Sequence, residues 1–307
     1  KEPKLFLRDD ITPQIIRIAS SRFKNKIRPI KLCYYGEVTR KKGSMLRPER
    51  QFLQVGSEII GSDTILADIE IISLAYKSLK EIGIKNITLE ITSKIFLEEI
   101  FSKIKDVNTL NKVKIYIKQK DIKNSLALIK NKGHRLLLKY LFNLTGSYRD
   151  LNKKINNFKF ADSLKSEIDK IKKISKKINF KNNDQIIIDF TEIDNKNYHD
   201  GIKFTFFAKN VRGEVASGGR YKIQRGDIQE SAVGFTCFMD TVLRASSFEK
   251  SKKKILIPFE TDDDIKIKLR KNKYIIYSFL GETSDIRLFA KNNLCTHIYE
   301  NNKIKKI

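Results

Sequence analysis

The sequence has little of what builds metal centres, disulfide frameworks or membrane spans. Its 307 residues include three cysteines, three histidines, five prolines and no tryptophan. Because the cysteines lie far apart and form no CxxC pair, they indicate neither a disulfide framework nor a zinc site. The histidines are just as scattered, and no apolar run approaches the roughly 18 residues that a bilayer span needs. With no signal peptide visible, we expect a cytosolic protein that uses no metal and no other cofactor.

Acidic residues are few relative to basic ones. Lysine and arginine total 62 against 36 aspartates and glutamates, which gives a net charge of +26. Such an excess is typical of nucleic-acid-binding proteins. Here, however, lysines are spread through nearly every segment among many isoleucines and asparagines, a composition that an AT-rich genome produces without selection for binding. We interpret the charge as a solvated surface and expect no specific nucleic-acid partner; weak nonspecific attraction to RNA is the alternative.

One segment of alternating residues indicates a binding site. The pattern predicts two strands joined by a basic loop over residues 40–50. In the second strand, alternation places Phe52, Gln54, Gly56 and Glu58 on one face. The glycine leaves an open floor between an amide and a carboxylate, whose backbones lie about 13 Å apart at ~3.3 Å per residue. Such a pair can hold a small bipolar ligand; the alternative is an ordinary half-exposed strand.

The same segment resembles motif 2 of class II aminoacyl-tRNA synthetases of the histidyl type. Arg40 falls where the arginine of the motif belongs, and Arg50, Phe52, Gln54 and Glu58 follow at the family spacing. This resemblance rests on an arginine in one strand and a Gln-x-Gly-x-Glu pattern in the next.

Two further stretches carry the same resemblance. LFLRDDITPQIIRI, from Leu5 to Ile18, resembles the family's Leu-Arg-Pro-Glu-Gly-Thr segment, and SGGRY, from Ser217 to Tyr221, resembles its Gly-Gly-Arg-Tyr-Asp. The three motifs stand in the family order, and the resemblance covers roughly residues 5–90 and 185–245. It implies an α+β fold with a class II synthetase-like antiparallel sheet, flanked by helices and interrupted by a helical insertion.

The positions that would hold a nucleotide depart from the family pattern. The glutamate two residues after the motif 2 arginine is Lys42 here, a reversal of charge. In GFTCFMDT, from Gly234, Phe238 stands at a glycine of motif 3 and Thr241 at its ATP-binding arginine. The family's Arg-Gly-Leu-Asp-Tyr-Tyr segment reads DNKNYH, so its catalytic arginine aligns with Asp194. Amino-acid activation needs such arginines, because a guanidinium binds phosphate oxygens bidentately and stays charged.

The positions that would hold the amino acid look preserved, and the resemblance implies a histidine-binding site there. Its residues would be Asp10, Thr12, Arg40, Gln54, Glu58, Tyr198, His199 and Tyr221. Structural alternatives stay open, since Asp10 can be an acidic residue near a helix N-terminus and the two tyrosines can be core aromatics. We also expect Thr12 to be the N-cap of a helix whose first residue is Pro13.

Histidine contacts without nucleotide contacts are typical of a sensor, and the chain resembles the regulatory-subunit family of ATP phosphoribosyltransferase. The family's Leu-Arg-x-Asp-x-Thr-Pro-Gln pattern is matched between Leu7 and Gln14. The resemblance implies a non-catalytic regulatory subunit of histidine biosynthesis, with histidine as effector and a short-form catalytic subunit as partner, as a homodimer within a hetero-oligomer. The alternatives are a degenerate histidyl-tRNA synthetase or related amino-acid ligase, and an RNA-binding module that uses the basic surface.

The pattern along the chain predicts one large part and one small part. We place the synthetase-like core at residues 1–250, with a mostly helical insertion at 93–180, and a small α/β segment at 251–307. The family's motif 1 helix and strand would precede Lys1, so we expect that region to be missing from this sequence. A full anticodon-binding domain is longer than the last segment, which disfavours tRNA charging.

Overall fold

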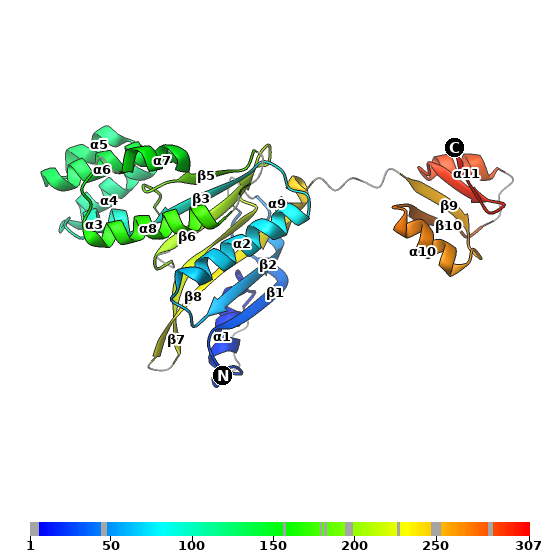
Figure 1. Cartoon of the computed structure of the whole chain (residues 1–307), viewed down its shortest axis with the longest axis horizontal. Coiled ribbons are helices and arrows are strands. Elements are labelled where there is room, and N and C mark those ends of the chain that lie inside the picture. Colours follow the sequence, from blue (N-terminus) through cyan, green and yellow to red (C-terminus); the bar gives the residue numbers. More distant parts are fainter. Residues whose placement is uncertain are drawn as a thin grey trace. The chain divides into compact units, whose positions relative to one another are not determined.

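The larger part of the chain is built on a strongly twisted mixed sheet (Figure 1). The computed structural model describes residues 6–43, 48–155, 158–178, 180, 183–193, 199–225, 228–246, 253–281 and 285–307. The chain forms two compact units, Lys1–Ser247 and Phe248–Ile307. Among the described residues, the sheet of the first unit has the strand order β1-β2-β8-β7-β6-β3-β5-β4. Its strands are β1 (Ile30–Thr39), β2 (Gln51–Ile60), β3 (Ile87–Ser93), β4 (Gly146–Ser147), β5 (Gln185–Ile188), β6 (Ile202–Ala208), β7 (Ala216–Arg225) and β8 (Ile228–Phe238).

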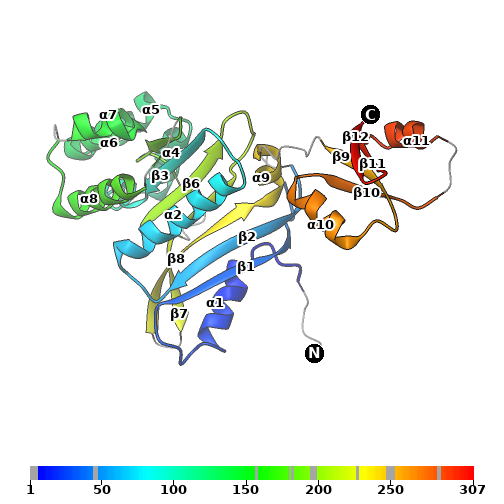
Figure 2. The same ribbon diagram turned by 45° about the vertical axis from the view of Figure 1, so that its right-hand side comes forward.

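Strands from distant parts of the sequence pair in the middle of this sheet. The β7–β8 hairpin pairs on one side with β6 and on the other with β2, all antiparallel. Only the β3–β5 pair is parallel within the described sheet. The expected antiparallel sheet flanked by helices is present except for that parallel pair, and the two views show β2 and β8 side by side (Figures 1 and 2). The strands β2, β8 and β7, which carry three of the sequence motifs, are therefore neighbours in one sheet.

Each face of the sheet has its own apolar core and its own helix. On the face that we call the α2 face, helix α2 (Ile65–Glu81) contributes Ile71, Ile72 and Leu79 to the large core. On the opposite face, the α1 face, helix α1 (Thr12–Ser20) contributes Ile15 to a smaller core that also contains Tyr34. The burial of β2 follows this division, since Phe52, Gln54, Gly56 and Glu58 are buried on the α1 face. The predicted alternation of β2 is confirmed.

Helices fill the chain between β3 and β5 and gather at one end of the sheet (Figures 1 and 2). Side-chain caps begin several of them: Asp106 Oδ2 accepts the Thr109 N–H at 2.8 Å, and Asn131 Oδ1 accepts that of His134 at 3.0 Å. Apolar residues at helical spacing face the core, as with Ile171 of the last helix. The helices are α3 (Ile95–Phe101), α4 (Val107–Lys118), α5 (Ile122–Leu128), α6 (Lys132–Leu144), α7 (Tyr148–Lys154) and α8 (Asp162–Lys177); α9 (Met239–Ala245) follows β8.

The second unit is a small α/β sheet. Its described strands run in the order β10-β9-β11-β12, with β9, β10 and β11 parallel and β12 antiparallel to β11. The helix after β9 begins with a cap from Asp262, whose Oδ1 accepts the Asp264 N–H at 2.7 Å, while the Thr261 hydroxyl donates to the Pro258 carbonyl. The elements are β9 (Lys254–Pro258), α10 (Asp263–Lys271), β10 (Ile275–Phe279), α11 (Ile286–Asn292), β11 (His297–Glu300) and β12 (Lys303–Lys306).

The described residues contain neither a membrane-spanning helix nor a metal cluster. None of the helices in the described ranges combines the length and apolarity that a membrane span requires. Within the same residues, no group of three or more His, Cys, Asp or Glu side chains is arranged to hold a metal ion. The cysteines are free thiols, and burial raises the pKa of Cys237 to about 12.

Candidate ligand-binding site

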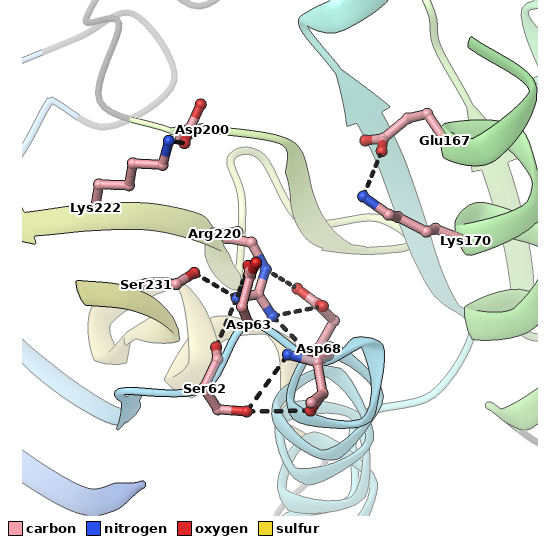
Figure 3. A network of polar contacts seen from close by, with 10 residues as sticks. Ser62, Asp63, Asp68, Glu167, Lys170, Asp200, Arg220, Lys222 and Ser231 are labelled. Carbon is pink, nitrogen blue, oxygen red and sulfur yellow. Dashed lines mark hydrogen bonds and ion pairs between the residues drawn. The ribbon is translucent and has the colours of Figure 1, made fainter. Parts of the chain in front are cut away.

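The Ser-Gly-Gly-Arg-Tyr motif of β7 serves both faces of the sheet. Alternation places Arg220 on the α2 face and its neighbours Gly219 and Tyr221 on the α1 face. Arg220 clamps the start of α2: its Nε lies 3.1 Å from Asp68 Oδ1 and its Nη2 2.7 Å from Asp68 Oδ2 (Figure 3). The same guanidinium donates to the Ser231 hydroxyl at 2.7 Å. Burial raises the pKa of Asp68, and Arg220 opposes that rise.

On the α1 face, Thr12, Glu58 and Tyr221 form a buried hydrogen-bonded group, the Glu58 cluster. The Thr12 hydroxyl donates to Glu58 Oε1 at 3.1 Å, and the Tyr221 hydroxyl donates to Glu58 Oε2 at 2.9 Å. Only 2% of Glu58 is exposed. Burial raises the pKa of Glu58 to about 8; the two hydroxyls lower it and the charge of Asp10 raises it. Burial therefore favours the protonated form of this carboxyl group, whereas its two hydroxyl donors favour the charged form.

The expectation that Thr12 caps a helix is wrong. The N-cap position of α1 is Ile11, which has no side-chain cap, and Thr12 is already the first helical residue. Its hydroxyl points to Glu58 because the helix begins directly against β2. The start of α1 is instead tied to the sheet by Gln54, whose Oε1 accepts the Ile11 N–H at 3.3 Å.

Asp10 lies at the entrance of this group. It is half-buried, and its Oδ1 accepts the Thr12 N–H at 3.3 Å. Its negative charge contributes to the raised pKa of both Glu58 and Tyr34, so it lies within electrostatic reach of the buried carboxyl. The segment 10–12 thus brings Asp10 and Thr12 to the row of β2 side chains that includes Gln54 and Glu58.

Glycines leave a shallow floor beside the cluster. Strand register places Gly234 of β8 opposite Glu58 and Gly219 of β7 opposite Gly234, and directly opposed residues share a face. A Cβ atom at Gly234 would stand 1.6 Å from Glu58 Oε2, and one at Gly219 would stand 2.6 Å from His199 Nδ1. The Glu58 carboxyl and the His199 ring therefore lie above neighbouring strands, which are roughly 5 Å apart. The row continues to Lys203 and Thr92.

A second row of small polar residues runs parallel to the first and was missed in the sequence. It joins Gly56 of β2 through Thr236, Ser217 and Thr205 to Glu90 of β3. Burial raises the pKa of Glu90 to about 7, and the charge of Glu192 raises it further. The individual strands gave no signal for this row, because it exists only in the pairing register.

Arg40 lies at the other end of the β2 row. Its Cζ is 5.0 Å from the centre of the Phe52 ring and 6.0 Å from that of Phe238, and the two rings meet edge to face. Because Phe52 and Glu58 are six residues apart, the Phe52 end of the row lies about 20 Å along the strand from Glu58. Tyr198, the remaining member of the predicted set, lies outside the described residues, as does Asp194.

The motif 3 position for a nucleotide-binding arginine is filled differently. Thr241 at the start of α9 is fully buried and accepts a hydrogen bond from Arg244 Nη2 at 3.2 Å. Arg244 is itself engaged by two carboxylates, Asp240 at 3.3 Å and Glu49 at 3.2 Å. Lys42 is exposed in the loop between β1 and β2. The nearest arginine side chain in this region is therefore already neutralised by protein carboxylates.

Comparisons with known proteins agree on one family. The model of the histidyl-tRNA synthetase family matches residues 1–242. The ATP phosphoribosyltransferase regulatory subunit of Paramagnetospirillum magneticum is 30% identical over 297 residues, which cover 95% of this chain and 76% of the relative. The regulatory subunit of Rhodospirillum centenum is 29% identical over 303 residues, which cover 98% of this chain and 78% of that relative.

Solved structures share the fold at lower identity. A histidyl-tRNA synthetase from Nostoc sp. has a TM-score of 0.72 at 13% identity, covering 97% of this chain and 77% of that one. A protein from Bacillus halodurans, described as an ATP phosphoribosyltransferase regulatory subunit/histidyl-tRNA synthetase, has a TM-score of 0.68 at 19% identity, covering 93% and 77%. An ATP phosphoribosyl transferase (HisG:HisZ) complex from Thermotoga maritima has a TM-score of 0.61 at 19% identity, covering 78% of this chain and 87% of that one.

Proposed function

The chain belongs to the family of ATP phosphoribosyltransferase regulatory subunits, within the histidyl-tRNA synthetase-like proteins, and on this basis we propose that it binds histidine and regulates a separate short catalytic subunit. The observation that carries the proposal is the contrast between the amino-acid positions and the nucleotide positions of the fold. The amino-acid side keeps a buried cluster of Thr12, Glu58 and Tyr221, while Thr241 replaces an arginine on the nucleotide side. A protein with this contrast can sense an amino acid without activating it.

Histidine offers an ammonium group, a carboxylate and an imidazole with N–H donors. The half-buried carboxylate of Asp10, next to Thr12, suits the ammonium group. Glu58 suits an imidazole N–H, because each carboxyl oxygen has two lone pairs and each accepts one hydroxyl hydrogen bond here. Gln54 can serve either end of the ligand through its amide.

Feedback requires that histidine bind one arrangement of the complex better than the other. A difference of about 1–3 kcal/mol in binding free energy is typical of such coupling. The Glu58 cluster is suited to this task because it joins α1, β2 and β7, so a ligand that displaces one of its hydroxyl donors acts on three elements at once. The ATP phosphoribosyl transferase complex from Thermotoga maritima supports a catalytic partner for this fold.

The test is reconstitution with a short catalytic phosphoribosyltransferase subunit. We expect a stable complex, a higher turnover of the catalytic subunit, and inhibition of that turnover by histidine. Failure of the two folded proteins to associate at micromolar concentration would contradict the proposal. Activation without any effect of histidine would retain the regulatory role and remove the sensor from this chain.

A further inference from the structure

A cavity of about 180 Å³ lies where the sheet meets the first two helices of the insertion. Thr92 and Lys203 form its floor on the α1 face, and Phe101 of α3 and Lys114 of α4 form its wall. His199 stands between this cavity and the Glu58 cluster. The volume corresponds to about six liquid waters at roughly 30 Å³ each, which is enough for one small organic molecule.

One carboxylate oxygen and one ammonium group on the cavity wall have no polar partner among the described residues. Glu192 Oε1 accepts from Lys203 Nζ at 2.5 Å, but its buried Oε2 has no hydrogen-bond partner among the described residues. Lys114 Nζ lies 5.4 Å from the centre of the Phe101 ring, and no described carboxylate lies within ion-pair distance of it. An incompletely satisfied carboxylate is unfavourable, so Glu192 as a lining residue favours a ligand that brings an N–H donor.

The net charge of the cavity lining favours a ligand that carries carboxylates in addition to the N–H donor. The lining has three lysines and two glutamates, which leaves one positive charge in excess. Lys94 pairs with Glu98 at 3.2 Å and is more than a quarter exposed, so it can also reach an anion in the cavity. The complementary ligand has one ammonium group and two carboxylates, with a net charge of −1.

We propose that this cavity is a second binding site, and that it takes a small amino dicarboxylate of the size of aspartate or glutamate. The ammonium group of the ligand donates to the Glu192 carboxylate, and its carboxylates lie against Lys114 and Lys94. The methylene groups contact the Phe101 ring. Because the floor belongs to β3 and β6 and the wall to α3 and α4, a bound ligand ties the insertion to the sheet.

The test is calorimetric titration of the whole chain with L-glutamate and L-aspartate. We expect saturable binding of at least one of them with a Kd of about 1 mM or tighter. Lys114→Met and Glu192→Gln should each weaken binding at least tenfold. Lys112→Met changes an exposed lysine of the same helix outside the cavity lining and should leave the affinity unchanged. Acetate and methylammonium, which each carry one of the required groups, should bind at least tenfold more weakly.

A variant of the first site separates this proposal from the histidine proposal. Glu58→Gln should leave glutamate and aspartate binding intact, whatever it does to histidine. If the amino dicarboxylate instead loses affinity with Glu58→Gln and keeps it with Lys114→Met, it occupies the first site and the second site is refuted. The absence of saturable binding by either amino acid means that the cavity holds only water, and it refutes the second site as well. A flat histidine titration alongside intact glutamate binding would contradict only the histidine proposal.

Discussion

The backbone of Gly234 and the carboxyl group of Glu58 are in direct contact across the β2–β8 pair. A methyl group at position 234 would stand 1.6 Å from Oε2 and 2.2 Å from Cδ of Glu58. Any larger residue there must therefore displace the carboxyl that Thr12 and Tyr221 hold in place.

Gly234→Ala should destabilise the protein by about 1–3 kcal/mol, because the new methyl group overpacks a buried site. Urea denaturation measures the change. Gly281→Ala is the matched control, since a Cβ there meets no atom within 4 Å, and it should change the free energy of unfolding by less than about 0.5 kcal/mol. Equal stability of the two variants would show that the Glu58 side chain moves aside at little cost.

The stability of the protein should decrease as pH rises toward 8 through the titration of Glu58. The pKa of this group is about 8 in the folded chain and lower in the unfolded chain, so the folded state binds more protons between those values. The contribution of Glu58 to the free energy of unfolding is fully present in acid and is lost as pH rises through about 8. The free energy of unfolding falls by at most about 1.4 kcal/mol per pH unit through this group.

Glu58→Gln should remove this contribution to the slope while keeping the shape of the side chain. Relative to wild type, the variant should gain stability from pH 5 to pH 8, measured by urea unfolding at each pH. Glu90 also has a raised pKa, but it is present in both proteins and cancels in the difference. Parallel stability curves would contradict the raised pKa of Glu58.

Arg220→Ala should cost about 3–5 kcal/mol of unfolding free energy, because it leaves Asp68 buried without its bidentate partner. Lys222→Ala is the control on the same strand. Its ion pair with Asp200 at 2.8 Å is exposed, so its loss should change stability little (Figure 3). A comparable loss in both variants would mean that burial does not distinguish these pairs.

The purified chain should not catalyse histidine-dependent exchange of pyrophosphate into ATP. Thr241 provides no guanidinium, and the nearby Arg244 is paired with Asp240 and Glu49. A histidyl-tRNA synthetase assayed in parallel serves as the positive control. Exchange above background would show that other groups bind the triphosphate and would favour the ligase alternative.

Asp10→Ala and Glu58→Gln should each weaken histidine feedback in the reconstituted complex. Removing one partner of a buried charged hydrogen bond costs about 2–5 kcal/mol, which corresponds to about thirtyfold or more in the inhibitory concentration. Activation of the catalytic subunit should survive, because neither residue is proposed to do chemistry. Inhibition at wild-type histidine concentrations in both variants would place the sensor elsewhere in the complex.

Local patterns predicted the two strands on either side of the basic loop and the polar row on β2. Alternation alone placed Gln54 and Glu58 on the same buried face, because a strand with one face in the core leaves little freedom in the direction of its side chains. The motif resemblance added the fold of the sheet.

Contacts between distant segments could not be predicted in this way. The Thr12 hydroxyl was expected at the helix backbone, yet it bonds to Glu58, because tertiary packing offers a buried acceptor that the local sequence does not contain. The row from Gly56 to Glu90 and the cavity beside Lys114 depend on strand register and on helix placement. Neither leaves a periodic signal in any one segment.

Arg220 and Tyr221, adjacent on β7 and hydrogen-bonded on opposite faces, also constrain how this strand pairs during folding. A slip of one residue would exchange the faces of the strand, turning Arg220 toward the Glu58 carboxyl and the Tyr221 ring toward α2. Asp68 would then stay buried without its guanidinium, and Glu58 would lose its phenolic donor. A slip of one residue is therefore penalised on both faces of the β7–β8 hairpin at once.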